Sequence, residues 1–479
     1  MSDTSSQERA QRIVRFLIWT YFILLIIEGA LRKWVVPQLS NPLLVVRDPV
    51  ALAIYFFSIR AGAFPKNTWC VVLVLIGVLC TACTYLALMD YLPLTKVTLI
   101  CGYGVHANFF HLPLIFVMAK VLRPEDVRRF GWCTLLLIIP MTFLMIAQFR
   151  ADPGAAINST AGGEGEMMTS ALGKVRTAGP FSFVIGVVLY FALATAFLLW
   201  GVLKRGTYKN WLLIASASAL VIGISVSGSR SAVASCALVV ASLAAVFVFR
   251  RDALNRSAQI LLATVILGFI VSRTPIFKEG VNVLTTRFNE VAEQTQESVA
   301  RGIVGRVWSG FTESAHVWTQ APLFGYGLGI GTNAGANILT GRSMFLLTEG
   351  EWSRIVLESG KFLGLAYIIW RVALTGYLGV LCIRVLKLGN LLPLFLFSAG
   401  AVSMINGQFG QPTILGFAVI TLGLALAATR EEEIDSVADE PVEEGIARPV
   451  ARTRSIHAER LHGPKAGSSG TNANGFRDH

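Results

Sequence analysis

Apolar runs of helix length recur along almost the whole chain, and they constrain its fold more than any other feature. A helix needs roughly 20 apolar residues to cross the hydrocarbon core of a bilayer. We therefore predict an all-α protein, a polytopic transmembrane bundle of about twelve helices. The predicted spans are 13–27, 43–59, 70–89, 97–119, 131–149, 181–203, 211–226, 231–249, 258–275, 360–383, 390–405 and 412–428.

The charged residues indicate how these spans are oriented. Only 15% of the chain is charged, against about a quarter in soluble domains, which argues against a water-soluble enzyme. The net charge of +12 is not read as a nucleic-acid footprint, because Lys and Arg are enriched in cytoplasmic loops of membrane proteins. With a cytoplasmic N-terminus every short inner connection is basic, and an even number of spans returns the C-terminus to the cytoplasm. The basic residues of these connections are Arg60, Lys66, Lys120, Arg123, Arg128, Arg129, Lys204, Arg205, Lys209, Arg250, Arg251, Arg256, Arg384 and Lys387.

This topology divides the chain into a membrane domain, residues 1–429, and a tail, residues 430–479. The tail is rich in Glu, Asp, Gly and Ser, so we expect it to be disordered in the cytoplasm. Two long segments, 150–180 and 276–358, face outward. The second contains several Trp and Phe, and we expect it to be partly helical and packed over the outer membrane face.

A turn of small polar residues precedes Arg230 between two predicted spans. Ser227, Gly228, Ser229 and Ser231 surround this arginine with hydroxyl groups and accessible backbone amides. Such groups around a fixed positive charge suit phosphate oxygens. The alternative is an arginine that only anchors its helix at the interface.

Alternating glycines occur at Gly325, Gly327, Gly329 and Gly331, downstream of Arg306. No strand–helix unit surrounds them, so a dinucleotide site is not predicted. We expect a close-packed re-entrant turn.

Acidic residues flank Arg354 in the stretch that follows. If the stretch is helical, Glu351, Arg354 and Glu358 share one face, and Glu349 lies just before them. One interpretation is a salt-bridged helix end. The other is a carboxylate general base held beside an anion-binding arginine.

Ionisable residues also occur inside predicted spans, where they cost several kcal/mol unless they face a partner or a polar cavity. Arg371 and the pair Arg47 and Asp48 are functional candidates for this reason. His106 and His111 are read as interhelical hydrogen-bonding groups, because a spacing of five does not place them on one face of an α-helix.

Arginines are unexpectedly frequent on the predicted outer side, where the orienting bias should deplete them, so we predict an anionic ligand there. Arginine binds phosphate bidentately, and several together can stabilise a diphosphate. No metal ion or cofactor is predicted. The candidate anion-binding residues are Arg47, Arg176, Arg230, Arg306, Arg354 and Arg371.

The order of these motifs over about residues 176 to 385 resembles the O-antigen polymerase and ligase superfamily of bacterial membrane glycosyltransferases. The motifs are Ser-Gly-Ser-Arg230, Arg306-Val-Trp308, Pro322-Leu-Phe-Gly325-Tyr-Gly327-Leu-Gly329 and Glu358-Ser-Gly360. The segment from Glu28 to Trp34 resembles an exopolysaccharide-type subgroup of that superfamily.

This resemblance implies a multi-pass protein of the bacterial inner membrane that acts on its periplasmic side. The donor would be an undecaprenyl-diphosphate-linked oligosaccharide, transferred with inversion to a sugar hydroxyl, and arginines would hold the diphosphate. Membrane lipid and other polysaccharide assembly proteins are the implied partners. Many members carry a His-Asn pair where this chain has Glu349-Gly350, so Glu349 or Glu351 would act as the base, with Glu358 as a third catalytic candidate.

Two other functions stay open. In a transporter or flippase of a lipid-linked oligosaccharide or another anionic solute, the outer arginines would load the substrate, and Asp48 and Arg371 would form a gating pair. Against this, no internal repeat and no pair of broken helices at corresponding positions is evident, although both are common in secondary transporters. The third possibility is a non-catalytic subunit of a polysaccharide complex.

Overall fold

The structure is a computed structural model that describes residues 2–162, 167–169, 171–249, 273–295, 312–342 and 344–430. Within these ranges the regular secondary structure is helical, and an isolated β-bridge joins Thr169 and Val175. The prediction of an all-α fold is thus confirmed for the described part of the chain. The predicted tail from residue 431 onward lies outside it.

In the described part of the chain, eight helical segments are long and apolar enough to cross a membrane, so the chain is a multi-pass membrane protein. A bent pair forms one further candidate span, and with two shorter apolar helices these segments match eleven of the twelve predicted runs. The twelfth, 258–275, falls almost wholly outside the described residues. The eight are α1 (Ser2–Ala30), α2 (Asp48–Arg60) with the 3-10 turn at Pro42–Val45, α3 (Thr68–Leu88), α6 (Pro124–Arg150), α7 (Val184–Leu203), α8 (Asn210–Ser227), α9 (Arg230–Ala241) continued by α10 (Leu243–Phe249), and α16 (Lys361–Leu388).

The bent pair is interrupted by a π-helix. α4 (Leu94–Val105) continues into the π-helix η4 (His106–Phe110), and α5 (Leu114–Val121) follows at an angle of 40°. π-Helical turns are rare and often occur at functional sites. A second π-helix, η1 (Leu31–Val35), ends α1.

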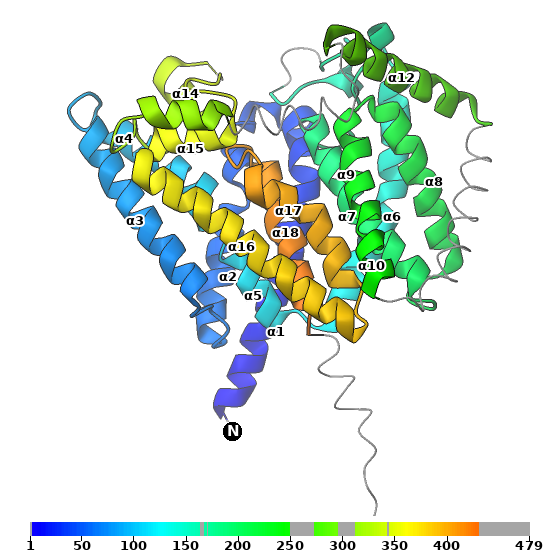
Figure 1. The fold of residues 1–479 in the computed structure, drawn as a ribbon, viewed down its shortest axis with the longest axis horizontal. Coiled ribbons are helices and arrows are strands. Elements are labelled where there is room, and N and C mark those ends of the chain that lie inside the picture. The colour runs from blue at the N-terminus through cyan, green and yellow to red at the C-terminus, as the bar shows by residue number, and fades with distance from the viewer. Residues whose placement is uncertain are drawn as a thin grey trace, which may run out of the picture. The chain divides into compact units, whose positions relative to one another are not determined.

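The two shorter helices, α17 (Leu392–Asn406) and α18 (Pro412–Ala428), form the centre of the bundle. α18 packs against α5, α7 and α17, and nearly all of its residues are buried. In contrast, α3, which lies at the edge of the bundle in Figure 1, exposes Val71, Val74, Leu75 and Val78. A helix that is apolar all round belongs in the interior, whereas exposed aliphatic side chains on α3 suit contact with lipid.

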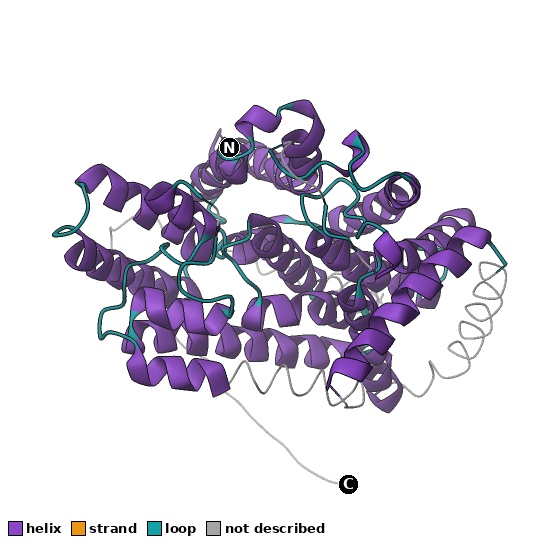
Figure 2. Ribbon diagram, turned by 90° about the horizontal axis from the view of Figure 1, so that it is seen from above, coloured by secondary structure: helices purple, strands orange, loops and turns teal. Residues whose placement is uncertain are grey.

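Basic connections gather at one end of the bundle. Arg430, just after α18, donates to the carbonyl oxygens of Ala119 and Lys120, and Arg15 of α1 lies 4.0 Å from Asp126 at the start of α6. At the opposite end lie α12 (Pro275–Thr295), α14 (Asn333–Thr340) and α15 (Glu351–Ser359), all from the predicted outer segment (Figure 1). The candidate site residues of α9 and α15 are therefore at the end away from the N-terminus of α1 (Figure 1). Seen from above, the described residues form helices joined by loops (Figure 2).

The alternating glycines form a close-packed turn between α3, α4 and α15. Gly325, Gly327 and Gly329 have φ of 76°, 119° and 95°, a region that residues with a Cβ rarely adopt. The amide of Gly327 donates to the carbonyl oxygen of Glu358 at 3.1 Å, and the amide of Leu328 donates to Thr84 Oγ1 at 2.9 Å. The expectation of a packed turn is confirmed, and this turn fixes the C-terminal half of α15.

We predict that Gly329→Ala destabilises the protein. A methyl group there would meet the Ile100 carbonyl and the backbone of Gly104, and the positive φ alone costs about 1–3 kcal/mol for a residue with a Cβ. The measurement is thermal unfolding of the detergent-solubilised protein. Gly102→Ala on the same helix α4 is the matched control, because its position has open space. Equal unfolding temperatures for the two variants would contradict the packing described.

Candidate functional site

α15 carries a buried ionic network on one of its faces. Arg354 Nε donates to Glu351 Oε2 at 3.0 Å, and Arg354 Nη1 donates to Glu358 Oε2 at 2.6 Å. Arg354 Nη2 also donates to Asn108 Oδ1 in η4 at 2.9 Å. The predicted sharing of one helical face by Glu351, Arg354 and Glu358 is confirmed, and the whole face is buried.

Arg371 extends this network from α15 to the neighbouring helices. Its Nη1 donates to Glu351 Oε1 at 2.7 Å, and its other donors reach the carbonyl oxygens of Ser403, Met404 and Gly407. The guanidinium also lies 3.8 Å from the ring centroid of Phe409, a cation–π contact. Arg371 is fully buried, and its hydrogen bonds connect α16, on which it lies, to α15 and to the α17–α18 connection.

The network is neutral, with two guanidiniums facing two carboxylates. Burial alone would raise the pKa of Glu351, but Arg354 and Arg371 outweigh it and lower that pKa below the usual range. At Glu358 burial dominates over Arg354 and raises the pKa. Because Glu351 accepts hydrogen bonds from both arginines and from the amide of Phe409, its carboxylate serves to stabilise the fold. Arg354 and Arg371 likewise donate their hydrogen bonds to groups inside the protein.

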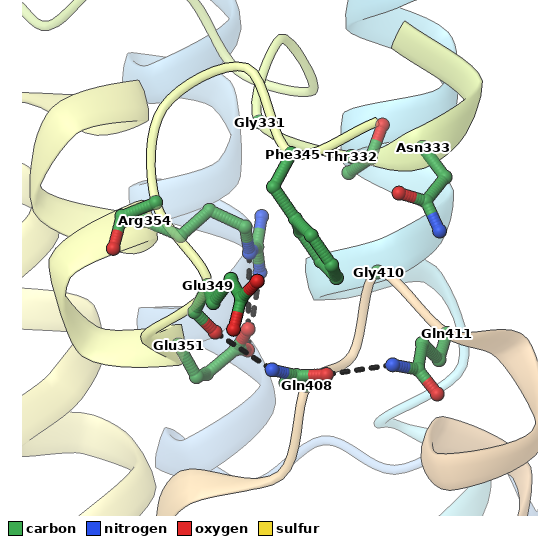
Figure 3. A pocket seen from close by; sticks show the side chains of 11 residues that line it. Gly331, Thr332, Asn333, Phe345, Glu349, Glu351, Arg354, Gln408, Gly410 and Gln411 are labelled. Carbon is green, nitrogen blue, oxygen red and sulfur yellow. Dashed lines mark hydrogen bonds and ion pairs between the residues drawn. The ribbon is translucent and has the colours of Figure 1, made fainter. Parts of the chain in front are cut away.

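A small pocket that opens to solvent lies beside this network (Figure 3). Gln408 Nε2 donates to the backbone oxygen of Glu349 at 2.7 Å, and Gln411 Nε2 donates to Gln408 Oε1 at 2.6 Å. Glu349 is exposed, unlike Glu351 and Glu358, so of the three predicted catalytic carboxylates it is the one that a solute can reach. The pocket is lined by Gly331, Thr332, Asn333, Phe345, Thr348, Glu349, Glu351, Arg354, Gln408, Gly410 and Gln411.

A second group of arginines gathers near the start of α9. Arg230 follows the left-handed Gly228, and its Nη1 donates to the backbone oxygen of Arg287 in α12 at 3.4 Å. Burial, together with the positive charges of Arg287 and Arg230, lowers the pKa of Arg176. Arg176 Nε is buried without a hydrogen-bond partner. We call Arg176, Arg230 and Arg287 the arginine cluster; it is a place where an anion would offset repulsion between like charges.

Arg287 is absent from the arginines predicted from the sequence, because nothing in its local pattern shows where its helix docks. The available signal is the amphipathic pattern of α12, which buries Ile276 and Val283. α12 packs on α8 and α9 and so brings Arg287 beside Arg230.

The segment from Glu28 to Trp34 positions the loop that carries Arg176. Lys33 Nζ donates to the carbonyl oxygens of Gly179 and Phe181 at 2.9 and 3.0 Å, and Trp34 Nε1 donates to that of Ala156 at 3.1 Å. Arg32 Nη1 donates to Ser182 Oγ at 3.3 Å. Hydrogen bonds from these side chains thus hold the described part of the loop between α6 and α7 in place.

The structure thus separates the predicted arginines. Arg47 is fully buried, 3.4 Å from Glu28 Oε2, and donates to Tyr21 Oη and to the Pro412 carbonyl. Arg354 and Arg371 belong to the α15 network, and Arg176 and Arg230 to the arginine cluster. Figure 1 draws α15 and α12 well apart at the same end of the bundle. Arg306 lies outside the described residues.

His106 and His111 lie together, contrary to the expectation from their spacing. In the π-helix η4 hydrogen bonds join residues i and i+5 rather than i and i+4, so positions five apart lie closer together than in an α-helix. His106 Nδ1 and His111 Nε2 are 3.3 Å apart, and both face the carboxylate of Asp48. A helical period of 3.6 cannot reveal this contact.

No protein-family model matches the chain, and no curated protein was found to be similar to it.

We predict that Glu351→Ala lowers the free energy of unfolding by about 3–5 kcal/mol, because it leaves two buried guanidiniums without their shared carboxylate. Glu349→Ala is the control; its side chain is exposed, so a change within about 0.5 kcal/mol is expected. Chemical unfolding of the purified protein in detergent measures both. A Glu351→Ala protein as stable as the Glu349→Ala protein would show that the network does not stabilise the fold.

Proposed function

We propose that this chain is a bacterial inner-membrane glycosyltransferase of the O-antigen polymerase or ligase type. It would transfer a glycan from an undecaprenyl-diphosphate-linked oligosaccharide to a sugar hydroxyl in a surface polysaccharide, at the periplasmic face. The observation that carries this proposal is the arginine cluster at one end of an apolar helical bundle. A ligand that is anionic at its head and apolar in its tail would match both features.

A diphosphate is the anion that suits three guanidiniums. Each arginine stays charged at physiological pH and offers donors in a planar fork that fits phosphate oxygens. The leaving group in the transfer is the lipid diphosphate, whose charge increases as the glycosidic bond breaks. Arginines at Arg176, Arg230 and Arg287 would stabilise that charge without rearranging, which is the main source of electrostatic catalysis.

Glu349 is the candidate base that the geometry favours, because the carboxylate of Glu351 is already fully hydrogen-bonded. A sugar hydroxyl is a poor nucleophile near neutral pH, and a positioned base contributes about 10²–10⁴-fold in rate. The base must lie within hydrogen-bond reach of that hydroxyl, whereas α15, which follows Glu349, and α12, which carries Arg287 of the arginine cluster, lie apart in Figure 1. Transfer therefore requires the two sites to approach each other when the donor binds, and the role of Glu349 stays a prediction.

We predict that Arg176→Ala and Arg287→Ala each reduce surface polymer strongly in a deletion strain, with the protein present at the wild-type level. Loss of one donor to the developing charge typically costs about 10²–10³-fold in rate. Arg342→Ala is the matched control, since this exposed arginine follows α14 at the same end of the bundle. Normal polymer from both cluster variants would refute the diphosphate site.

Glycan analysis of the deletion strain separates polymerase from ligase. Loss of a polymerase leaves acceptors that carry at most one repeat, whereas loss of a ligase leaves long chains on the lipid carrier. Wild-type glycans in the deletion strain would argue against both.

Transport of a lipid-linked oligosaccharide is the second candidate, and the broken helix favours it. The bend of 40° between α4 and α5 places Asp48, His106 and His111 at an interruption of a membrane-spanning segment, as in transporters whose discontinuous helices line a substrate path. Purified protein in liposomes with a fluorescent lipid-linked oligosaccharide distinguishes the two functions. Movement of the lipid between leaflets without an acceptor would favour transport.

A further inference from the structure

Three side chains with metal-binding groups converge where α4 is interrupted. Asp48 begins α2, His106 begins the π-helix η4, and His111 directly follows it. Asp48 Oδ2 lies 2.8 Å from His106 Nδ1, Asp48 Oδ1 lies 3.0 Å from His111 Nε2, and the two ring nitrogens are 3.3 Å apart.

We propose that Asp48, His106 and His111 bind one divalent transition-metal ion of the zinc class. Nitrogen and oxygen ligands at 2.0–2.1 Å from one ion, at angles between 90° and the tetrahedral value, lie about 2.8–3.4 Å from each other. The distance between the two ring nitrogens falls in this interval, and so does the distance from each of them to its nearer carboxylate oxygen, Oδ2 of Asp48 for His106 and Oδ1 for His111. Two imidazoles with one carboxylate favour zinc or a neighbouring first-row metal over magnesium or calcium, which prefer oxygen ligands.

Hydrogen bonds among Asp48, His106 and His111 pair their polar atoms less well than a bound ion would. Without an ion, both rings can donate to this carboxylate only in one pair of tautomers, which places two N–H groups with like partial charges side by side at 3.3 Å. An ion replaces both protons and binds one nitrogen of each ring together with the carboxylate of Asp48. The π-helix is what makes this possible, because a regular α-helix would turn His111 away from His106.

The surroundings supply further features of a metal site. Tyr21 Oη lies 3.3 Å from His111 Nδ1, the ring nitrogen that does not face Asp48, so it can fix the orientation of the ring. Arg47 donates to the same hydroxyl, and Glu28 at 3.4 Å balances its charge.

The site is reachable and incomplete, which indicates an exchangeable ion. The side chain of Asp48 is 27% exposed, whereas those of His106 and His111 are buried. Three protein ligands leave at least one coordination position for water or a solute, the arrangement of reactive rather than purely structural zinc sites. This inference does not rest on the glycosyltransferase proposal.

Cobalt titration of the full-length protein tests the site. The protein is purified in detergent without a polyhistidine tag and treated with a chelator, and Co²⁺ is then added while its visible absorption is recorded. We expect one saturable high-affinity Co²⁺ site per chain, displaced by Zn²⁺ and not by Mg²⁺, together with a higher unfolding temperature. Because His457, His462 and His479 also lie in this chain, each measurement is repeated with those three residues replaced by Ala.

Variants assign the binding to these residues. Asp48→Asn keeps the size of the side chain and is expected to abolish the site, and Tyr21→Phe, which removes only the outer hydroxyl, is expected to weaken Co²⁺ binding about 10–100-fold. His316→Ala is the control, since this histidine is exposed on the segment before the glycine turn. Thermal unfolding without metal identifies variants that fold. Absence of saturable Co²⁺ binding, or unchanged affinity in a folded Asp48→Asn protein, would overturn the proposal.

Discussion

Pairing of buried charges is the constraint on which this structure depends. A single ionised group in an apolar bundle costs several kcal/mol, and removing one partner of a buried pair is similarly costly. Arg371 reaches Glu351 on α15 and three carbonyl groups near the end of α17, and Arg47 joins Glu28 on α1 to the start of α18. These interactions join helices that are far apart in the sequence. They therefore favour one arrangement of helices whose apolar surfaces are otherwise alike.

The arginines therefore divide into two physical classes. Arg354 and Arg371 are neutralised by carboxylates. If a ligand took the place of these carboxylates, buried acidic groups would lose their partners. Besides burial, it is instead the charges of Arg287 and Arg230 that lower the pKa of Arg176. Like charges brought together in this way attract an anion. Lys33, although buried, serves a third purpose, because it donates to two carbonyl oxygens and so organises the loop that carries Arg176.

Helix positions, the packed glycine turn and the shared face of Glu351, Arg354 and Glu358 could be predicted from the sequence, because each depends on local periodicity or backbone conformation. The pairing of Arg371 with Glu351 could not, since either residue offers several possible partners and the choice depends on how α15 and α16 fold back across Gly360. The contact of His106 with His111 was hidden for another reason. The contact requires a π-helix, and no residue type in that segment predicts one.

Asn108 connects the interrupted helix to the α15 network. It lies between the two histidines in η4, its side-chain oxygen accepts from Arg354, and its backbone oxygen accepts from the hydroxyl of Tyr367 on α16. A shift of the histidine pair must therefore displace a partner of the α15 network, whose Arg354 lines the pocket. By thermodynamic reciprocity, if a ligand bound at Asp48 changes the affinity of that pocket for a solute, the solute changes the affinity at Asp48 by the same factor. Two chemically unlike sites are thus joined by one amide side chain.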